Sequence, residues 1–360
     1  MENPKIGIVT IVYAENYGAV LQCYALKQIL LKKYGDNISV LDYYSEADKV
    51  GYGILYNTLL KKHLWISYAK YLFKLPFVYH KKVKRKSIFE NFRNTYLEPR
   101  NAKKLDVIVY GSDQIWAYAP DFGGYNSVYW GEGYEGTRKI AYSASMGIIT
   151  DVDNHFITKH ICKFDSISVR ENELHDFLEK FYSKPINVTL DPTLLLDFNY
   201  WSIFAGGTNI FNCDYILVYN LNGNEVIRKA AQYLSQKTNL KIVEILGCPQ
   251  VNENFYSRST FTPNEFVTLF KFASYVLTSS FHGTVFSMIF KKDFWVSQKN
   301  NTKRVMSLLT AFGYQGRFID QEVISEVDHI DYSTFDTKLG SIKKQSEDYL
   351  FNSIENEKKS

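Results

Sequence analysis

Short apolar runs alternate with amphipathic stretches along most of the 360-residue chain. The runs are rich in Val, Ile and Leu, which is typical of strands that are buried on both faces of a parallel sheet. The stretches between them repeat their apolar positions every three or four residues, the period of a helix that packs one face onto a sheet. This alternation predicts an α/β fold in which helices connect parallel strands by right-handed crossovers. The predicted strands are 6–12, 38–43, 106–110, 139–145, 166–170, 187–190, 215–220, 241–246, 275–279 and 293–297, and the predicted helices are 20–31, 152–163, 171–181, 225–236, 263–273, 282–290 and 302–312.

The order of these elements divides the chain into two α/β halves. The alternation stops in an irregular stretch around Gly206-Gly207 and then begins again. We therefore expect two Rossmann-like, doubly wound domains, at 1–200 and 201–330, which face each other across a cleft, and a charged helical tail at 331–360 that docks on the body. A cleft between two such domains is the usual place for a binding site.

Basic residues are concentrated in one block of the first half, within a helical insertion at about 53–104. Residues 61–104 contain thirteen Lys or Arg against only Glu90 and Glu98, so this block carries +11 and the remaining chain −7 of a total of +4. Apolar residues from Leu64 to Phe73 recur at helical spacing, which predicts a pair of basic amphipathic helices. Two interpretations stay open: a solvated surface on which Lys and Arg stems cover apolar neighbours, or peripheral contact of 61–104 with an anionic membrane.

Composition and cysteine usage narrow the class of protein. The nearly neutral chain creates no field that would draw it to nucleic acid, so no nucleic-acid partner is predicted. Its four cysteines are scattered without a CxxC pair, which predicts neither a zinc site nor a disulfide and is typical of the reduced cytoplasm. The apolar start at 6–14 is interpreted as a buried strand rather than a signal peptide, and no apolar window is long enough to span a membrane. We expect a cytoplasmic protein, held at the inner face of the membrane if the basic block binds lipid.

Two short patterns resemble ligand motifs but favour structural explanations. Gly131, Gly133 and Gly136 match a dinucleotide fingerprint, yet they precede a predicted strand rather than a helix, so they are interpreted as turn residues. The pair Asp151 and Asp153 is interpreted as a helix cap. No spacing of His, Cys or acidic residues predicts a metal site.

The connection 278–284 joins a predicted strand to a predicted helix and is the strongest local candidate for a site. Ligands bind at this edge of open α/β sheets, and the backbone N–H groups at 283–285 are expected to point at an anion. His282 would stand at the mouth, able to donate or accept a proton near neutral pH. The alternative is that His282 only caps the helix and Phe281 fills the core. The candidate substrate-binding residues here are Ser279, Ser280, Gly283 and Thr284.

Arg170 ends another predicted strand, again at the carboxyl edge of a sheet. A long cation in this place suits a carboxylate or phosphate, although a salt bridge with Glu171 or Glu173 explains it equally well. Polar loops at the corresponding strand ends of the first half either form walls of a substrate site or are ordinary turns. The candidates in these loops are Asn16, Tyr17, Gly18, Ser112, Asp113 and Gln114.

Five short motifs, in this order, resemble the polysaccharide pyruvyl transferase family. No single motif is decisive, but their order and spacing extend over nearly the whole chain, from about residue 5 to 313. The motifs are Asn16-Tyr17-Gly18-Ala19-Val20-Leu21-Gln22 with Tyr24-Ala25-Leu26, Gly111-Ser112-Asp113-Gln114-Ile115-Trp116, Ser168-Val169-Arg170-Glu171, Asp191-Pro192-Thr193-Leu194-Leu195-Leu196 and Ser280-Phe281-His282-Gly283.

The resemblance implies two Rossmann-like domains arranged as in GT-B glycosyltransferases. It also implies transfer of the pyruvyl unit of phosphoenolpyruvate to a sugar of a bacterial surface polysaccharide, or of its polyprenyl-diphosphate-linked precursor, with formation of a cyclic ketal and release of phosphate. Arg170 would hold phosphoenolpyruvate, with Arg304 as a second cation, and His282 would act on protons at the same site. No metal or nucleotide cofactor is expected. A GT-B glycosyltransferase that uses a sugar nucleotide and a non-enzymatic α/β binding module remain the alternatives.

Overall fold

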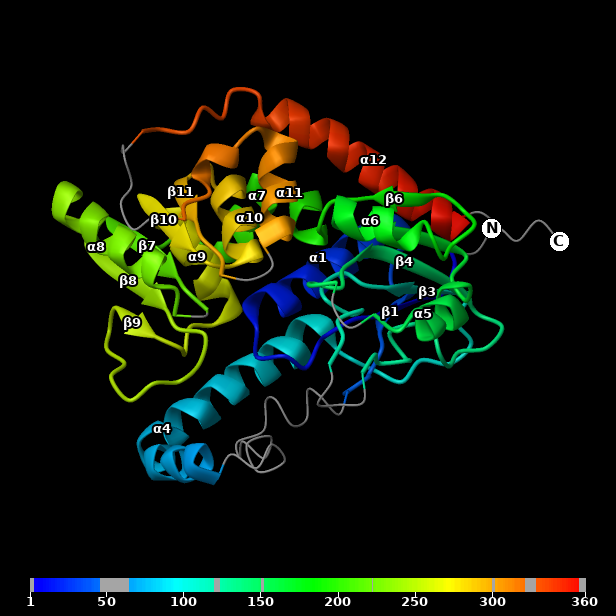
Figure 1. The fold of residues 1–360 in the computed structure, drawn as a ribbon, viewed down its shortest axis with the longest axis horizontal. Coiled ribbons are helices and arrows are strands. Elements are labelled where there is room, and N and C mark those ends of the chain that lie inside the picture. Colours follow the sequence, from blue (N-terminus) through cyan, green and yellow to red (C-terminus); the bar gives the residue numbers. More distant parts are fainter. Residues whose placement is uncertain are drawn as a thin grey trace.

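Two parallel sheets with interleaved helices form the chain, which confirms the predicted α/β fold (Figure 1). The computed structural model describes residues 3–45, 65–119, 124–149, 152–221, 223–299, 302–320 and 328–355. The boundaries predicted for two domains stay a prediction.

The first sheet has six strands in the order β2-β1-β3-β4-β5-β6, and every neighbouring pair is parallel. All six correspond to predicted strands, and every one except the edge strand β6, whose Asn187 and Val188 are exposed, is almost wholly buried. The strands are β1 (Ile6–Val9), β2 (Ile38–Val40), β3 (Val107–Tyr110), β4 (Arg138–Ala144), β5 (Ser166–Val169) and β6 (Ile186–Val188), and the helices between them include α1 (Tyr17–Tyr34), α5 (Asn154–Ile161) and α6 (Asn172–Leu178).

The second sheet has five parallel strands in the order β11-β10-β7-β8-β9. Its edge strand β9 (Ser257–Arg258) is only two residues long and was not predicted, because so short a segment has no pattern of its own. The other strands are β7 (Tyr215–Tyr219), β8 (Lys241–Ile245), β10 (Tyr275–Thr278) and β11 (Asp293–Val296), and the helices are α8 (Glu225–Thr238), α9 (Pro263–Phe272), α10 (Phe281–Ile289) and α11 (Thr302–Phe312), with a 3₁₀ turn at η4 (Gln315–Arg317).

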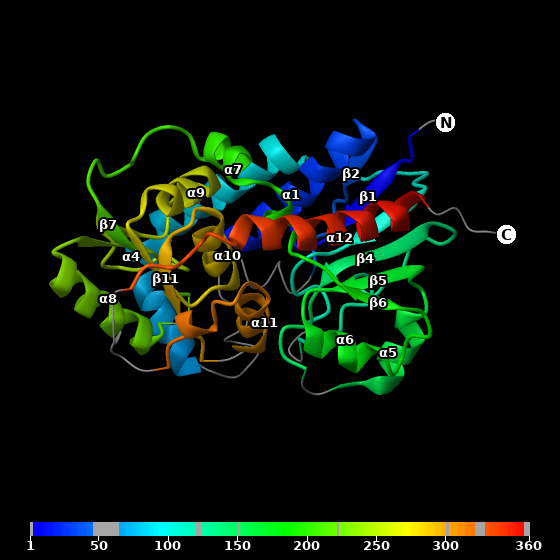
Figure 2. The ribbon, with the colours of Figure 1, turned by 90° about the horizontal axis from the view of Figure 1, so that it is seen from above.

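Helical segments also connect the two sheets. The chain leaves the first sheet through η3 (Pro192–Leu195) and α7 (Phe198–Ala205), in a region that the sequence suggested was irregular. The last helix, α12 (Phe335–Glu355), crosses back from the second sheet to the first (Figure 2). There the Tyr349 hydroxyl donates to the Ala141 carbonyl at 3.0 Å, so the predicted tail docks on the body.

One apolar core also joins the two halves. Tyr17 of α1 and Phe266 of α9 are both fully buried and stack with their ring centroids 4.6 Å apart. The Tyr17 hydroxyl donates to the carbonyl of Phe261 at 2.8 Å, so this aromatic side chain fastens the first helix to the second sheet. The fixed contact matters for function because residues from both sheets form the site described below.

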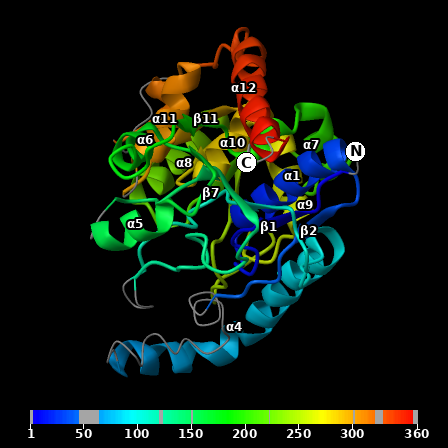
Figure 3. The same cartoon turned by 90° about the vertical axis from the view of Figure 1, so that its right-hand side faces the viewer.

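The described part of the basic insertion contains one long helix. Helix α4 (Trp65–Phe92) runs on into the π-helical turn η1 (Arg93–Leu97). The helix bends (Figure 3), and Pro76 inside it removes a backbone hydrogen bond, which is a usual cause of such a bend. Residues 53–64 of the predicted insertion, including Leu64, lie outside the described residues, so the predicted pair of helices stays a prediction. Among the helices of the described ranges, none combines the length and apolarity needed to cross a membrane.

Candidate functional site

The carboxyl ends of strands in the first sheet bring a buried ion pair together. Ser112 follows β3, Arg170 follows β5 and Asp191 comes shortly after β6. Arg170 Nη2 donates to the Ser112 hydroxyl at 2.6 Å and lies 3.0 Å from Asp191 Oδ2, with Asp113 Oδ1 at 3.9 Å. The partner of Arg170 is therefore Asp191 and not, as the alternative interpretation proposed, an acid next to it in sequence.

Asp191 also contacts a histidine that the second sheet supplies. His282 lies in the first turn of α10, and its Nε2 is 3.5 Å from Asp191 Oδ2. Burial by itself would raise the pKa of the fully buried Asp191, but Arg170, His282 and Thr193 outweigh it and hold the pKa well below its ordinary value. The carboxylate therefore stays ionised, and it orients both the guanidinium and the imidazole.

Gly18 leaves the space that the His282 ring occupies. A Cβ atom at position 18 would overlap Nδ1, Cγ and Cε1 of the imidazole. Gly18 lies in the first turn of α1, where Asn16 caps the helix by accepting hydrogen bonds from the N–H groups of Gly18 and Ala19 at 2.9 and 3.4 Å. The glycine is thus required for a close approach between an N-terminal helix and the histidine, and not for its backbone freedom.

A second buried arginine lies beside the first. Arg304 of α11 and Arg170 both contact the ring of Phe281, with their Cζ atoms 5.2 and 4.7 Å from its centroid. Arg304 Nε is also 3.9 Å from Glu171 Oε1. Burial lowers the pKa of Arg304, and the charge of Arg170 lowers it further, but a guanidinium stays protonated in proteins. The site thus holds two buried cations around one aromatic ring.

These arginines have unused hydrogen-bonding capacity. In the part of the chain that the structure describes, Nε and Nη1 of both Arg170 and Arg304 are buried without a hydrogen-bond partner, as are Glu171 Oε1 and His282 Nε2. Buried polar atoms in folded proteins are nearly always satisfied, so a group of them in one place indicates a ligand. Four unpaired guanidinium nitrogens suit an anion with several oxygens.

The prediction that the backbone N–H groups at 283–285 point at an anion is wrong for Gly283 and Thr284, whose N–H groups have partners within the protein. The helix begins at Phe281, one residue earlier than predicted. The N–H of Gly283 is therefore capped by the Ser280 hydroxyl at 3.3 Å, and the N–H of Thr284 donates to the Ser280 carbonyl at 3.0 Å. Phe281 and His282 are the first helical residues, so their N–H groups have no acceptor within the helix.

Several other candidates have identifiable local contacts. Ser279 accepts a hydrogen bond from the Leu221 N–H at 2.9 Å, and the Thr284 hydroxyl donates to the Ser280 carbonyl at 3.1 Å. Tyr17 is fully buried, whereas Asp113 and Gln114 are partly accessible. Substrate contacts by these residues stay predictions. The structure brings together Arg170, His282, Arg304, Gly18, Ser112 and Asp113, and it places Tyr17 in the core between the sheets.

A buried network positions Ser112. The Gln22 amide donates to the Thr10 hydroxyl at 3.0 Å, and its carbonyl accepts from the Ser112 N–H at 3.1 Å. The Thr10 hydroxyl in turn donates to the Ser112 carbonyl at 2.9 Å. Gln22 was part of a recognised motif without a role, and its place in α1 lets one side chain fix the loop after β3 against β1.

Sequence reasoning missed Asp191, Glu171 and Phe281 as parts of the site. A signal for Asp191 existed, since it follows a predicted strand whose end adjoins that of the strand before Arg170. Phe281 and Glu171 carried no such signal, because an aromatic residue at a helix start and an acid next to an arginine have common structural roles.

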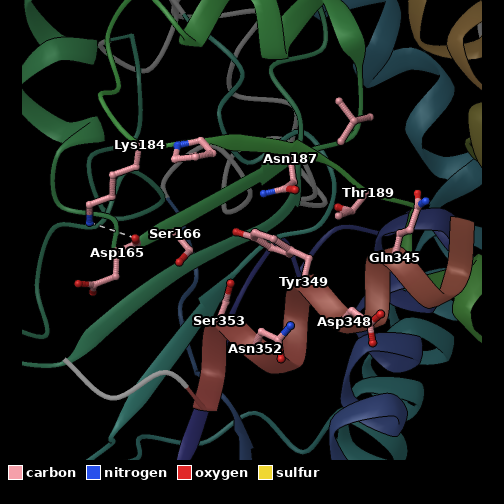
Figure 4. Close-up of a pocket in the computed structure, with 12 residues that line it drawn as sticks. Asp165, Ser166, Lys184, Asn187, Thr189, Gln345, Asp348, Tyr349, Asn352 and Ser353 are labelled. Atoms are coloured by element: carbon pink, nitrogen blue, oxygen red, sulfur yellow. Dashed lines mark hydrogen bonds between the residues drawn. The ribbon is translucent and has the colours of Figure 1, made fainter. Parts of the chain in front are cut away.

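A separate concavity lies at the opposite edge of the first sheet (Figure 4). Its volume is about 660 Å³, and it is lined by residues from the start of β5, from along the edge strand β6 and from one face of α12. Lys184 Nζ donates to the Asp165 carbonyl at 3.1 Å across one side of it. Its lining contains none of the predicted site residues.

The fold and the site together define an α/β protein in which residues from two parallel sheets surround two buried arginines with unpaired nitrogen atoms. A family model for polysaccharide pyruvyl transferase matches residues 16–296, so the chain belongs to the polysaccharide pyruvyl transferase family, a family of transferases. No curated protein sequence matches the chain.

Solved structures show the fold relationship. UDP-N-acetylglucosamine 2-epimerase from Rickettsia bellii is similar with a TM-score of 0.52 and 8% identity, over 97% of this chain and 96% of that one. S. aureus MnaA, solved with UDP, is similar with a TM-score of 0.49 and 12% identity, over 98% of this chain and 88% of that one. The likeness to the Rickettsia enzyme supports the GT-B-like arrangement of two Rossmann-like units.

Proposed function

We propose that this protein transfers the pyruvyl group of phosphoenolpyruvate to a sugar of a surface polysaccharide or its lipid-linked precursor, forming a cyclic ketal and releasing phosphate. The observation that carries the proposal is the pair of buried arginines, Arg170 and Arg304, with four nitrogen atoms that lack partners in the described structure. Phosphoenolpyruvate carries a carboxylate and a phosphate on one small framework, so two adjacent guanidinium groups suit it.

His282 has the position of an acid–base group beside this anion site. As a neutral imidazole it takes the proton of the acceptor hydroxyl that attacks C2 of phosphoenolpyruvate, and as an imidazolium it protonates the departing phosphate. The ionised Asp191, with Oδ2 3.5 Å from Nε2, orients the ring. Arg170 shares the same carboxylate at 3.0 Å, so substrate binding and proton transfer are coupled through Asp191.

The proposal is tested by ligand-dependent thermal stability followed by product analysis. A ligand present at a hundred times its Kd stabilises the folded state by about 2.7 kcal/mol, which moves the melting temperature measurably. We expect a shift with phosphoenolpyruvate, and phosphate release once glycans with paired hydroxyl groups are added, with mass spectrometry locating the ketal. A shift with sugar nucleotides alone would favour the alternative, a GT-B glycosyltransferase; binding of phosphoenolpyruvate without turnover would favour a binding module.

We also expect helix α4 to bring the enzyme to an anionic membrane. Phe73 and Phe77 are 77% and 63% exposed and lie one helical turn apart, with ring centroids separated by 6.5 Å. Lys70 and Lys74 are exposed at the matching helical positions, so basic and aromatic side chains share one face. This combination is typical of helices that lie in the headgroup region, where a lipid-linked acceptor presents its sugars.

Replacing both Lys70 and Lys74 by glutamine is expected to weaken binding to vesicles of anionic phospholipid by about thirtyfold, because each basic residue near such a surface contributes about 1 kcal/mol. Co-sedimentation at low and physiological salt measures the effect. The control variant is Ile203→Ser, at an exposed position of α7, and it should leave vesicle binding unchanged. If the wild-type protein shows no salt-sensitive sedimentation with these vesicles, α4 is not a membrane-docking helix.

Alanine at Gly18 is expected to lower turnover at least tenfold with little loss of helix stability. The added methyl group overlaps the His282 ring and must displace it from Asp191. Gly340 in α12 provides the control, since a Cβ atom there meets nothing within 4 Å. Phosphate release and circular dichroism compare the two variants, and wild-type turnover in Gly18→Ala would show that the close approach is unnecessary.

A further inference from the structure

We propose that Glu171 is a second proton-transfer residue, which protonates C3 of phosphoenolpyruvate and then, as a carboxylate, accepts the proton of the second acceptor hydroxyl. The inference rests on the proposed function and assigns a role to a side chain that the motif comparison left unexplained.

The side chain of Glu171 does not cap the helix that follows it. It is the N-cap residue of α6, where an acidic side chain ordinarily accepts hydrogen bonds from the first turn, yet it forms no such bond. Its side chain is instead 6% exposed, with Oε1 lying 3.9 Å from Arg304 Nε. Oε1 has no hydrogen-bond partner in the described structure. An unpaired, buried carboxyl oxygen beside the two arginines is placed to act on whatever they bind.

The surroundings of Glu171 raise the pKa of its carboxyl group. Burial raises its pKa, and Arg170, Arg304 and the Ser145 hydroxyl lower it less than burial raises it, while Asp113 adds to the rise. A bound dianionic or trianionic substrate would raise the pKa further, because it adds negative charge next to the carboxyl. The pKa of Asp191, which faces the same Arg170, is shifted in the opposite direction, and its carboxylate stays ionised.

Ketal formation needs a second proton carrier because two hydroxyl protons must leave the acceptor. In the first step, the Glu171 carboxyl gives its proton to C3, the first acceptor hydroxyl forms the C–O bond at C2, and His282 takes the proton of that hydroxyl. The double bond of phosphoenolpyruvate is consumed, and the product is a tetrahedral adduct that still carries phosphate. Glu171 is now a carboxylate and His282 an imidazolium.

The second step returns both residues to their starting states. The imidazolium of His282 protonates the phosphate as its C–O bond to C2 breaks, the second hydroxyl closes the ring at C2, and the Glu171 carboxylate takes the proton of this hydroxyl. One hydroxyl proton has then gone to phosphate through His282, and the other replaces the proton that Glu171 gave to C3. No oxidant, metal or net proton is needed.

The test compares Glu171→Gln with Glu173→Gln, a change on the same helix at a glutamate that pairs with the exposed Lys303. Glu171→Gln is expected to lower kcat for phosphate release at least a hundredfold and to keep the thermal shift with phosphoenolpyruvate, because the amide cannot donate a proton to carbon. Glu173→Gln should behave as wild type.

Wild-type activity is expected to fall as pH rises through the pKa of Glu171. In Glu171→Asp this fall in activity on the basic side of the pH profile, the basic limb, is expected at lower pH, since Asp ordinarily titrates below Glu.

The outcomes separate this inference from the proposed function. Turnover of Glu171→Gln within threefold of Glu173→Gln overturns the role of Glu171 alone. An unmoved basic limb in an active Glu171→Asp variant does the same, because a purely structural residue would not set the pH profile. Failure of the wild-type protein to bind phosphoenolpyruvate contradicts the proposed function and, with it, this mechanism.

Discussion

Glutamine at position 282 is expected to reduce pyruvyl transfer by about a hundredfold to ten-thousandfold, the range that a positioned acid–base group contributes. The imidazole is the group that the proposed reaction uses twice, first as base and then as acid. Glutamine retains a hydrogen-bonding side chain toward Asp191 but titrates at no accessible pH. Steady-state phosphate release with phosphoenolpyruvate and an acceptor measures the loss, and the melting temperature of His282→Gln should stay near that of wild type.

His175 provides the matched control for this experiment. It lies in α6 with a quarter of its side chain exposed and pairs with Asp176 and Glu179 on the surface. His175→Gln should leave turnover unchanged. If His282→Gln kept near-wild-type turnover, the imidazole would be removed from the mechanism, and the site would have to transfer both protons through other groups.

Asp191→Asn is expected to cost about 3 to 5 kcal/mol of unfolding free energy, together with most of the activity. The substitution keeps the shape but leaves the buried guanidinium of Arg170 without its counter-charge at 3.0 Å, and a buried ion that loses its partner is strongly destabilising. Urea unfolding of wild type and variant measures the difference. The surface variant Asp176→Asn should unfold like wild type, because its side chain is 77% exposed.

The difference in unfolding free energy between wild type and Asp191→Asn is expected to depend on pH. The pKa of Asp191 is lowered in the folded state, so its contribution to stability is fully present above the ordinary carboxyl pKa of about 4 and is lost as pH falls through the lower folded value. The stability gap between wild type and Asp191→Asn should therefore be constant from about pH 5 upward and narrow below about pH 4. A gap that instead widened toward acid would mean that Asp191 does not carry the charge assigned to it.

The boundaries of single elements depended on contacts that no local pattern contains. The helix at the candidate site begins at Phe281 because the Ser280 hydroxyl caps Gly283, and this one-residue change redirects the free N–H groups. In the basic insertion, helix α4 runs through Pro76 as one bent helix, although a proline inside a helix often ends it. The first strand ends at Val9, earlier than predicted, because Thr10 turns to hold the loop at Ser112.

The candidate site was predictable in part. Arg170 and His282 stood out because each follows an apolar strand at the edge where parallel sheets bind ligands. Their common partner Asp191 did not, although it lies in a motif that the family resemblance included. A side chain becomes part of a site through its neighbours in space. Those neighbours depend on the order of strands in the sheet, which cannot be deduced from the distances between residues along the sequence.

The sequence by itself determined the α/β alternation, the two groups of parallel strands, the basic block and the family, because each is a local pattern or a motif of consecutive residues. Tertiary structure decided which charges meet. Residues as distant as 18, 170, 191, 282 and 304 converge because the carboxyl ends of strands from both sheets are held together by a shared apolar core. In that core Arg170, His282 and Thr193 keep Asp191 ionised against the effect of burial, whereas burial raises the pKa of Glu171, a difference between two carboxylates that composition and spacing cannot contain.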